Sequence, residues 1–153
     1  EQAKAALCSG ATIVTDTNMA LSGISKPSLT KLGAKALCLM ADPDIAREAK
    51  ERGVTRAVVS MEHAARLDGP LIFAVGNAPT ALIRLHELIG RDEVKPALVI
   101  GVPVGFVNVV EAKELFIGGK TPYIIARGRK GGSNVAAAIV NALLYQLIRR
   151  EGF

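Results

Sequence analysis

The stretch Leu71–Thr80, LIFAVGNAPT, decides the fold of this chain. Its first five residues form an uninterrupted apolar run, which is typical of a strand buried on both faces of a parallel sheet. Gly76-Asn77 ends the run, and Ala78-Pro79-Thr80 begins a helical pattern, since proline is favoured in the first turn of a helix. The stretch therefore predicts a strand, a tight turn and a helix in succession.

The turn at Gly76 and Asn77 is a candidate binding site. Backbone N–H groups and the positive end of a helix dipole converge where a strand ends and a helix begins, which suits an anionic or strongly polar ligand. Gly76 would let a ligand approach the backbone, and Asn77 supplies a neutral donor and acceptor. The alternative is that these residues only join a strand to a helix, and the residues alone leave both interpretations open.

Four further apolar runs alternate with helical patterns along the chain. They are Ala11–Thr15, Ala34–Met40, Ala97–Val102 and Pro122–Ala126. This alternation predicts an α/β fold with a doubly wound, five-stranded parallel sheet covered by helices on both sides, in three layers. The flavodoxin-like strand order is the most economical arrangement, and it places a ligand crevice between the carboxyl ends of the first and third strands.

One segment, Ser22–Leu32, departs from this alternation. It contains Gly23 and Pro27, is followed by Gly33, and predicts a loop long enough to be a flap.

The composition limits the kind of protein and its partners. With 153 residues, of which 50% are hydrophobic, we expect a single domain over 1–153 with a real core. Aromatic residues make up only 4%, which argues against an aromatic platform for single-stranded nucleic acid. The net charge of +5 fits an acidic ligand, but the cations are scattered among carboxylates and form no stripe for nucleic acid.

The two cysteines bear on the cellular compartment. Cys8 and Cys38 form no C-x-x-C pair, and we expect buried free thiols in a reducing compartment. The longest apolar stretch, Val135–Ile148, is short for a membrane span and contains polar residues. We therefore expect a cytoplasmic protein without a membrane partner.

Two glycine-rich turns carry candidate binding chemistry. Gly101–Phe106, GVPVGF, would expose Phe106 and backbone amides, which suits a large, flat, partly apolar ligand; the alternative is a glycine-rich exit from a strand. Arg127–Ser133, RGRKGGS, places three cations and consecutive amides before a helix, which can form an anion-binding nest; the alternative is a solvated basic loop. Neither has the spacing of a Walker or dinucleotide loop.

The titratable residues of the sequence do not indicate a particular reaction. His63 and His86 both fall on polar helix faces, which predicts surface positions. No Ser-His-Asp or Cys-His set can be assembled, and no metal-ligand spacing is present. From the residues alone we predict a glycine-lined, cationic crevice for a carboxylate-rich ligand.

Four stretches in register resemble the precorrin-8X methylmutase family of cobalamin biosynthesis. They are Thr15–Ile24, Val75–Leu82, Ile100–Glu114 and Arg127–Asn134. The resemblance implies a flavodoxin-like fold and a homodimer with active sites near the subunit interface. It also implies an isomerase that moves a methyl group from carbon 11 to carbon 12 of a corrinoid ring, with a small-molecule corrinoid substrate and no cofactor or protein-bound metal.

The resemblance also implies twelve substrate-binding residues. They are Asp16, Asn18, Met19, Arg56, Asn77, Ala78, Thr80, Gly105, Phe106, Arg127, Gly132 and Ser133. By motif, Asn77, Ala78 and Thr80 would donate at a helix start. Gly105 and Phe106 would face the ring, while Arg127, Gly132 and Ser133 would hold carboxylate arms.

The resemblance assigns no catalytic residue to this sequence. The family's catalytic histidine lies in an amino-terminal helical segment that comes before the first residue here, and neither His63 nor His86 matches it. We therefore expect weak or absent turnover by this chain, with corrinoid binding retained. The alternative is a non-catalytic corrinoid-binding module on the same scaffold. A nucleotide-dependent enzyme lacks its phosphate-loop fingerprints here, and a purely structural dimer module leaves three glycine-rich turns without a purpose.

Overall fold

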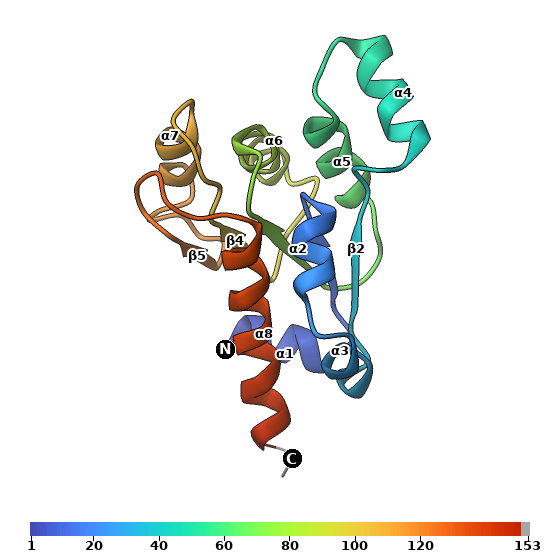
Figure 1. The fold of residues 1–153 in the computed structure, drawn as a ribbon, viewed down its shortest axis with the longest axis vertical. Helices are drawn as coiled ribbons and strands as arrows, with labels where there is room; N and C mark the ends of the chain where they lie inside the picture. Colours follow the sequence, from blue (N-terminus) through green and yellow to red (C-terminus); the bar gives the residue numbers. More distant parts are fainter. Residues whose placement is uncertain (151–153) are drawn as a thin grey trace.

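The computed structural model describes residues 1–150, and the side chains of residues 1–148. Its centre is a five-stranded, all-parallel sheet in the order β2-β1-β3-β4-β5 (Figure 1). The strands are β1 Thr12–Thr15, β2 Lys35–Cys38, β3 Leu71–Val75, β4 Leu98–Gly101 and β5 Tyr123–Ile125. Each lies within one of the five apolar runs, so the strand assignment and the flavodoxin-like order are confirmed.

In this strand order, the connections that follow the adjacent strands β1 and β3 lead in opposite directions across the sheet. β1 pairs with β2 on one side and with β3 on the other, and Thr15 is aligned with Ala74. The carboxyl ends of β1 and β3 therefore lie side by side, which is the switch point at which doubly wound sheets bind ligands.

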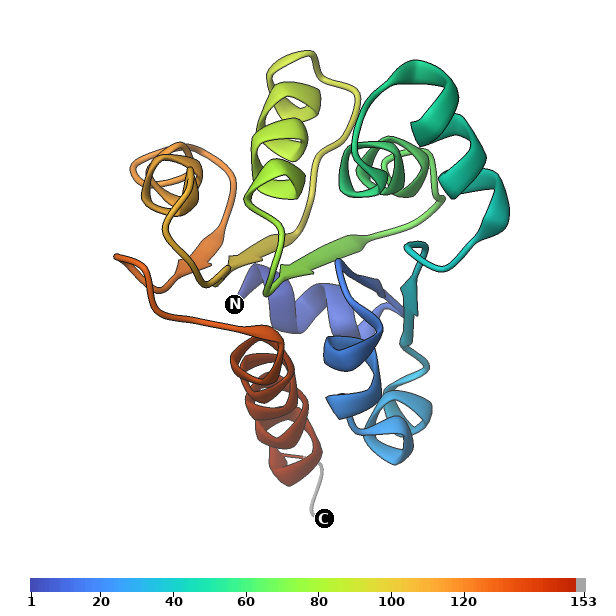
Figure 2. The same ribbon diagram turned by 45° about the horizontal axis from the view of Figure 1, so that its top comes forward.

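Helices cover both faces of the sheet (Figure 2). They are α1 Gln2–Cys8, α2 Asn18–Gly23, α3 Lys26–Leu32, α4 Pro43–Arg52, α5 Arg56–Ala64, α6 Pro79–Gly90, α7 Val109–Glu114 and α8 Ser133–Arg150. Helices α1, α2, α3 and α8 pack on one face and α5, α6 and α7 on the other, with α4 against α5. Along β3, Ile72 and Ala74 enter the first core while Phe73 and Val75 enter the second, because side chains alternate along a strand.

The expected flap at Ser22–Leu32 is wrong, because this segment ends α2 and forms α3. The Thr17 and Ser25 hydroxyl oxygens accept hydrogen bonds from the amides of Ala20 and Ser28, and each caps a helix. Pro27 lies in the first turn of α3 rather than in a loop. These starting signals outweigh the glycine and proline content from which the loop was predicted.

Helix α8 holds this pair of helices in place. The Asn141 side-chain oxygen accepts from the Ser25 amide at 2.8 Å, and its amide nitrogen donates to the Gly23 carbonyl at 2.8 Å. Gly23 itself approaches Ala137 so closely that an added Cβ would lie 2.8 Å from the alanine Cβ. The last helix thus locks the segment that follows β1.

The two cysteines differ in their exposure to solvent. Both cysteines are free thiols, but Cys8 is exposed and Cys38 half-buried, so the expectation of burial is wrong for Cys8. The buried face of α1 consists of Ala3, Ala6 and Leu7, and at about 100° per residue Cys8 falls outside this face. Within residues 1–150, the structure contains no helix that is long and apolar enough to cross a membrane.

Candidate functional site

Asp16 is the centre of the carboxyl edge of the sheet. Its side chain is 1% exposed, and one carboxylate oxygen accepts from the Gly76 amide at 2.8 Å. The other oxygen accepts from the amides of Asn77 at 2.9 Å and Ala78 at 2.7 Å. The carboxylate of this chain therefore occupies the amide nest at the β3–α6 turn, where the sequence predicted a ligand.

Burial dominates the electrostatics of this carboxyl group. Removal from water raises the pKa of Asp16 above its ordinary value, although the amides of Gly76, Ala78 and Asn77 act in the opposite direction. With three backbone donors already bound, Asp16 ties the end of β1 to the start of α6. The backbone amides of Asn77 and Ala78 are not free to donate to a ligand in this structure.

The start of α8 joins the same edge. Thr17 and Ser133 share a hydrogen bond of 2.7 Å between their hydroxyl oxygens, and the Gly132 amide donates to the Val102 carbonyl at 2.8 Å. A Cβ at Gly76 would lie 2.7 Å from the Ser133 Cα, and one at Gly131 would collide with the Val102 carbonyl. Glycine is required at both places because two backbones meet there. We call Asp16, Thr17, Gly76–Ala78 and Ser133 the strand-end cluster.

Several of the expected binding side chains remain open around this cluster. Asn18, Asn77 and Arg127 are exposed, and within the described part of the chain their side chains have no hydrogen-bond or ion-pair partner. Met19 is 72% exposed. These side chains can therefore meet a ligand without first breaking a contact.

Phe106 and Arg129 form an exposed pair above the edge. The Phe106 side chain is 82% exposed, and the Arg129 guanidinium carbon lies 5.8 Å from its ring centroid, within the range of a cation–π contact. The Gly105 amide donates to the Arg129 carbonyl at 3.1 Å and so joins the β4–α7 and β5–α8 loops. With Val104 and Val107 also exposed, the rim combines apolar surface with cations.

The last two expected residues lie beside α5 and α6. Thr80, in the first turn of α6, lines a groove of about 310 Å³ with Val58 and Ile83. Arg56 is the first residue of α5 and is exposed, and among residues 1–148 its guanidinium has no polar partner. Among residues 1–148, no hydrogen bond or ion pair joins Arg56 to the strand-end cluster.

Two residues of the site were missed from the sequence. Thr17 stands directly before a helix, and a search for hydroxyl residues that cap a helix could have found it. Lys113 is 1% exposed, and its ammonium donates to the carbonyls of Gly128 at 2.8 Å and Lys130 at 2.9 Å. Burial lowers the pKa of Lys113. No sequence signal marks it, because its acceptors are backbone atoms.

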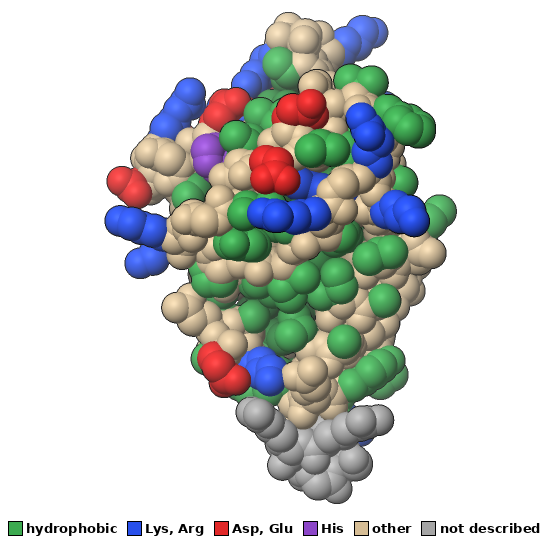
Figure 3. Space-filling model, turned by 90° about the vertical axis from the view of Figure 1, so that its left-hand side faces the viewer, with side chains coloured by type: hydrophobic (Ala, Val, Ile, Leu, Met, Phe, Trp, Pro, Cys, Tyr) green, Lys and Arg blue, Asp and Glu red, His purple; other side chains and the backbone are tan. Residues whose placement is uncertain are grey.

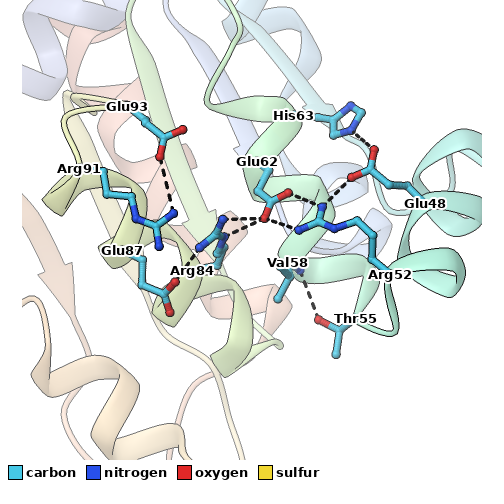
Figure 4. A network of polar contacts seen from close by, with 10 residues as sticks. All are labelled: Glu48, Arg52, Thr55, Val58, Glu62, His63, Arg84, Glu87, Arg91 and Glu93. Carbon is cyan, nitrogen blue, oxygen red and sulfur yellow. Dashed lines mark hydrogen bonds and ion pairs between the residues drawn. The ribbon is translucent and has the colours of Figure 1, made fainter.

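A second polar group lies away from the strand ends, on α4, α5 and α6 (Figure 4). Glu62 accepts hydrogen bonds from Arg52 at 2.6 Å and Arg84 at 2.8 Å. Arg52 also bonds Glu48, and Arg84 also bonds Glu87. We call these five residues the outer network. The Arg52 hydrogen bond is the main reason that the pKa of Glu62 lies below its ordinary value.

The histidines belong to these helices rather than to the strand ends. His63 Nε2 lies 2.9 Å from a Glu48 carboxylate oxygen, which is the main cause of the lowered pKa of Glu48. His86 is exposed, with its ring edge-on to Phe116 at 5.6 Å. The described residues hold no group of three His, Cys, Asp or Glu side chains able to bind a metal ion.

Comparison with known proteins identifies the relatives of this chain. The family model for precorrin-8X methylmutase matches residues 1–146. The cobalt-precorrin-8 methylmutase of Salmonella typhimurium is 49% identical over 88% of this chain and 63% of its own length. The precorrin-8X methylmutase of Pseudomonas aeruginosa is 42% identical over 92% of this chain and 68% of its own length.

A solved structure agrees with the fold. The precorrin-8x methyl mutase of Thermus thermophilus superposes with a TM-score of 0.86 and 36% identity, over 97% of this chain and 73% of that one. The present chain spans less than two thirds of the length of the Salmonella relative. Nearly all of the present chain, residues 1–146, matches the family model. The chain belongs to the precorrin-8X methylmutase family.

Proposed function

We propose that this chain is the corrinoid-binding part of a methylmutase of cobalamin biosynthesis, an isomerase that moves a methyl group from carbon 11 to carbon 12 of precorrin-8X or cobalt-precorrin-8. Family membership supports the reaction class. The observation that carries the proposal for the site is the exposed Phe106 ring with Arg129 above it, at the carboxyl edge of the sheet.

The substrate explains this combination of side chains. A corrinoid is a large, flat, partly apolar ring with many acetate and propionate arms. Phe106, Met19 and the exposed valines offer apolar surface to the ring, and Arg127 offers a free guanidinium to a carboxylate arm. Arginine binds carboxylates through two parallel hydrogen bonds, so it also fixes the orientation of the arm.

The rearrangement is an isomerisation, so it requires little redox chemistry from the protein. The carbon–methyl bond at carbon 11 breaks while that at carbon 12 forms, and the electron pairs shift within the conjugated ring. The chain's own residues would bind the ring, hold its arms and exclude water. Asp16 contributes indirectly, because it fixes the turn that presents the Asn77 side chain.

We also propose a cytoplasmic homodimer. β5 is one of the two outer strands of the sheet, and a groove of about 440 Å³ beside it is lined by Leu98, Pro122, Tyr123, Ile124 and Leu143 together with residues of α1. The side of the molecule that carries α7, β5 and α8 shows hydrophobic side chains gathered across its middle (Figure 3). A second copy of the chain would cover this surface and the free edge of β5.

A titration with hydrogenobyrinic acid, the rearranged product, tests the function. We expect saturable binding, followed by visible absorption, and about tenfold weaker binding by Arg127→Met or Asn77→Ala, since each loses one polar contact to the ligand. Arg47→Met is the matched control, because Arg47 is an exposed arginine on α4. Sedimentation of the same samples reports whether the bound species is a dimer.

The outcomes separate the candidate functions. Conversion of precorrin-8X by the wild-type chain would establish the methylmutase. Binding without conversion, even after the amino-terminal segment of a relative is added to the chain, would favour the non-catalytic corrinoid-binding module. Absence of binding by a folded chain, or equal losses in Arg47→Met and Arg127→Met, would contradict the proposed site.

A further inference from the structure

Thr17 and Ser133 form a hydroxyl pair at the carboxyl edge of the sheet. Their oxygens lie 2.7 Å apart and join two distant parts of the chain, since Thr17 comes directly before α2 and Ser133 begins α8. Both residues are half-buried, so solvent reaches them. The family resemblance expects Ser133 to hold a carboxylate arm of the ligand, but it gives Thr17 no role. The contact between the two therefore calls for its own explanation.

Both residues of the pair are held in place. The Thr17 carbonyl accepts from the Thr15 hydroxyl at 2.9 Å, and the Thr17 hydroxyl oxygen accepts from the Ala20 amide at 3.0 Å. Threonine is also stiff about χ1, because two heavy atoms branch from its Cβ. Gly76 lies so close to Ser133 that an added Cβ would be 2.7 Å from the Ser133 Cα. The two backbones are therefore fixed at the distance that the hydroxyl contact requires.

The hydroxyl pair has one more proton than it has acceptors in the protein. A hydroxyl group donates one hydrogen bond and accepts two. Among residues 1–148, the further partner of the pair is the Ala20 amide, which itself donates to Thr17. One hydroxyl proton therefore has no protein acceptor. It lies on Ser133 if Thr17 donates, and on Thr17 if Ser133 donates.

The Ala20 amide decides between these two directions. An oxygen that accepts a hydrogen bond makes its own O–H a stronger donor, because each bond in a chain polarises the next. Thr17 accepts from Ala20, so the Thr17 O–H is the better donor of the pair and points to Ser133. Ser133 then accepts from Thr17 and keeps its own proton for an acceptor outside the protein.

We propose that Thr17 is a positioning residue, which turns the Ser133 hydroxyl proton outward so that it donates to a carboxylate arm of the ligand. The proposal rests on the proposed function, in which the ligand is a ring with several such arms. A carboxylate only accepts hydrogen bonds, so it needs the outward proton. Bonds to a charged acceptor are also stronger than bonds between neutral groups. With the opposite direction, Ser133 would present a lone pair, which repels a carboxylate.

Corrinoid titrations on a double-mutant cycle test this role. Wild type, Thr17→Val, Ser133→Ala and the double variant are each titrated with hydrogenobyrinic acid and followed by visible absorption. We expect about tenfold weaker binding for Ser133→Ala and about fivefold for Thr17→Val, which keeps the shape of threonine without its hydroxyl. In the Ser133→Ala background, Thr17→Val should weaken binding by less than about twofold, because Thr17 acts through Ser133.

Two further variants separate positioning from helix stability. Thr17→Ser keeps the hydroxyl and should restore binding to within about twofold of wild type. Ser25→Ala removes a hydroxyl that caps α3 as Thr17 caps α2, and it should bind the corrinoid as wild type does. Urea denaturation reports the lost cap, which both Thr17→Val and Ser25→Ala should show.

The outcomes distinguish this inference from the proposed function. Equal losses from Thr17→Val with and without the Ser133 hydroxyl would overturn the positioning role and leave corrinoid binding standing, as would equal losses in Ser25→Ala. Absence of binding by the folded wild-type chain would overturn both. If Thr17→Val does not fold, a crystal structure of the wild-type chain with hydrogenobyrinic acid decides. A carboxylate oxygen within about 3 Å of Ser133 Oγ, with the Thr17 contact intact, supports the role, and a Ser133 hydroxyl bonded to Thr17 alone overturns it.

Discussion

The strand-end cluster and the outer network are both polar, but they are built in different ways. In the strand-end cluster, the Asp16 side chain bonds to backbone amides and is almost completely buried. In the outer network, side chains bond to other side chains, and each arginine has a second carboxylate available. In the strand-end cluster, no other acceptor in the described part of the chain is available to replace the Asp16 carboxylate. In the outer network each arginine keeps one carboxylate when the other is lost.

The difference separates positions that shape the site from positions that only join helices. A buried amide that loses its acceptor cannot turn to water, so the full desolvation cost remains. In the outer network Glu62 is also buried, but Arg52 is half-exposed and each arginine keeps a second carboxylate, so the loss of one ion pair costs less. The two regions should therefore respond very differently to comparable mutations.

The largest effect is expected for Asp16→Ala. The substitution leaves the amides of Gly76, Asn77 and Ala78 without an acceptor, and we expect the free energy of unfolding to fall by about 3 kcal/mol or more. Urea denaturation measures it, with Asp68→Ala, at an exposed aspartate, as the control. A loss equal to that of the control would show that Asp16 does not hold the turn.

A smaller effect is expected for Glu62→Gln. Arg52 retains Glu48 and Arg84 retains Glu87, so we expect a loss of about 1–2 kcal/mol at low salt. In 1 M NaCl the loss should shrink, because the Debye length falls to about 3 Å. Glu51→Gln, at an exposed glutamate on α4, is the control, and a salt-independent loss would contradict the ionic interpretation.

The smallest expected effect is a difference between Asp16 and Glu62 in how each makes the free energy of unfolding depend on pH. Because burial raises the folded-state pKa of Asp16, its protonated form favours the fold, and this contribution is lost as pH rises through the raised pKa. Because Arg52 lowers the pKa of Glu62, its contribution is present above the ordinary pKa of a glutamate and is lost as pH falls through the lowered value. Titration of the two carboxyl groups should thus change the free energy of unfolding in opposite directions.

Urea denaturation from about pH 3 to pH 7 measures this difference. Relative to wild type, Asp16→Asn should gain stability as pH rises, and Glu62→Gln should gain as pH falls, each by under about 1 kcal/mol. Parallel curves for the two variants would show that one of the shifts has the wrong direction.

The sheet was predictable from the sequence because its signal is local. Leu71–Val75 matches β3 at both ends, and the other strands lie within the apolar runs. The layers follow from alternation between strands and helices. The predicted flap is wrong because glycine and proline also occur at helix ends: Thr17 and Ser25 cap helices that contain Gly23 and Pro27.

The site was predictable only in outline. Motifs placed Asn77, Phe106 and Arg127 at one edge of the sheet, and the structure brings their loops together there. The contacts that hold these loops were not predictable. Asp16 and Lys113 bond to backbone atoms of other segments, and every residue has the same backbone groups, so the sequence does not indicate which of them are bound.

The contact between Thr17 and Ser133 has a consequence for the order of folding. It joins residues 116 positions apart, and Asn141 reaches back over 118 positions to Gly23. Contacts of such long sequence separation form slowly, because a large loop must close first. During synthesis on a ribosome, β1 and β3 can pair long before α8 has emerged. The strand-end cluster therefore stays incomplete until the start of α8 has been made, and the corrinoid that we propose as its ligand cannot bind to the complete cluster before then.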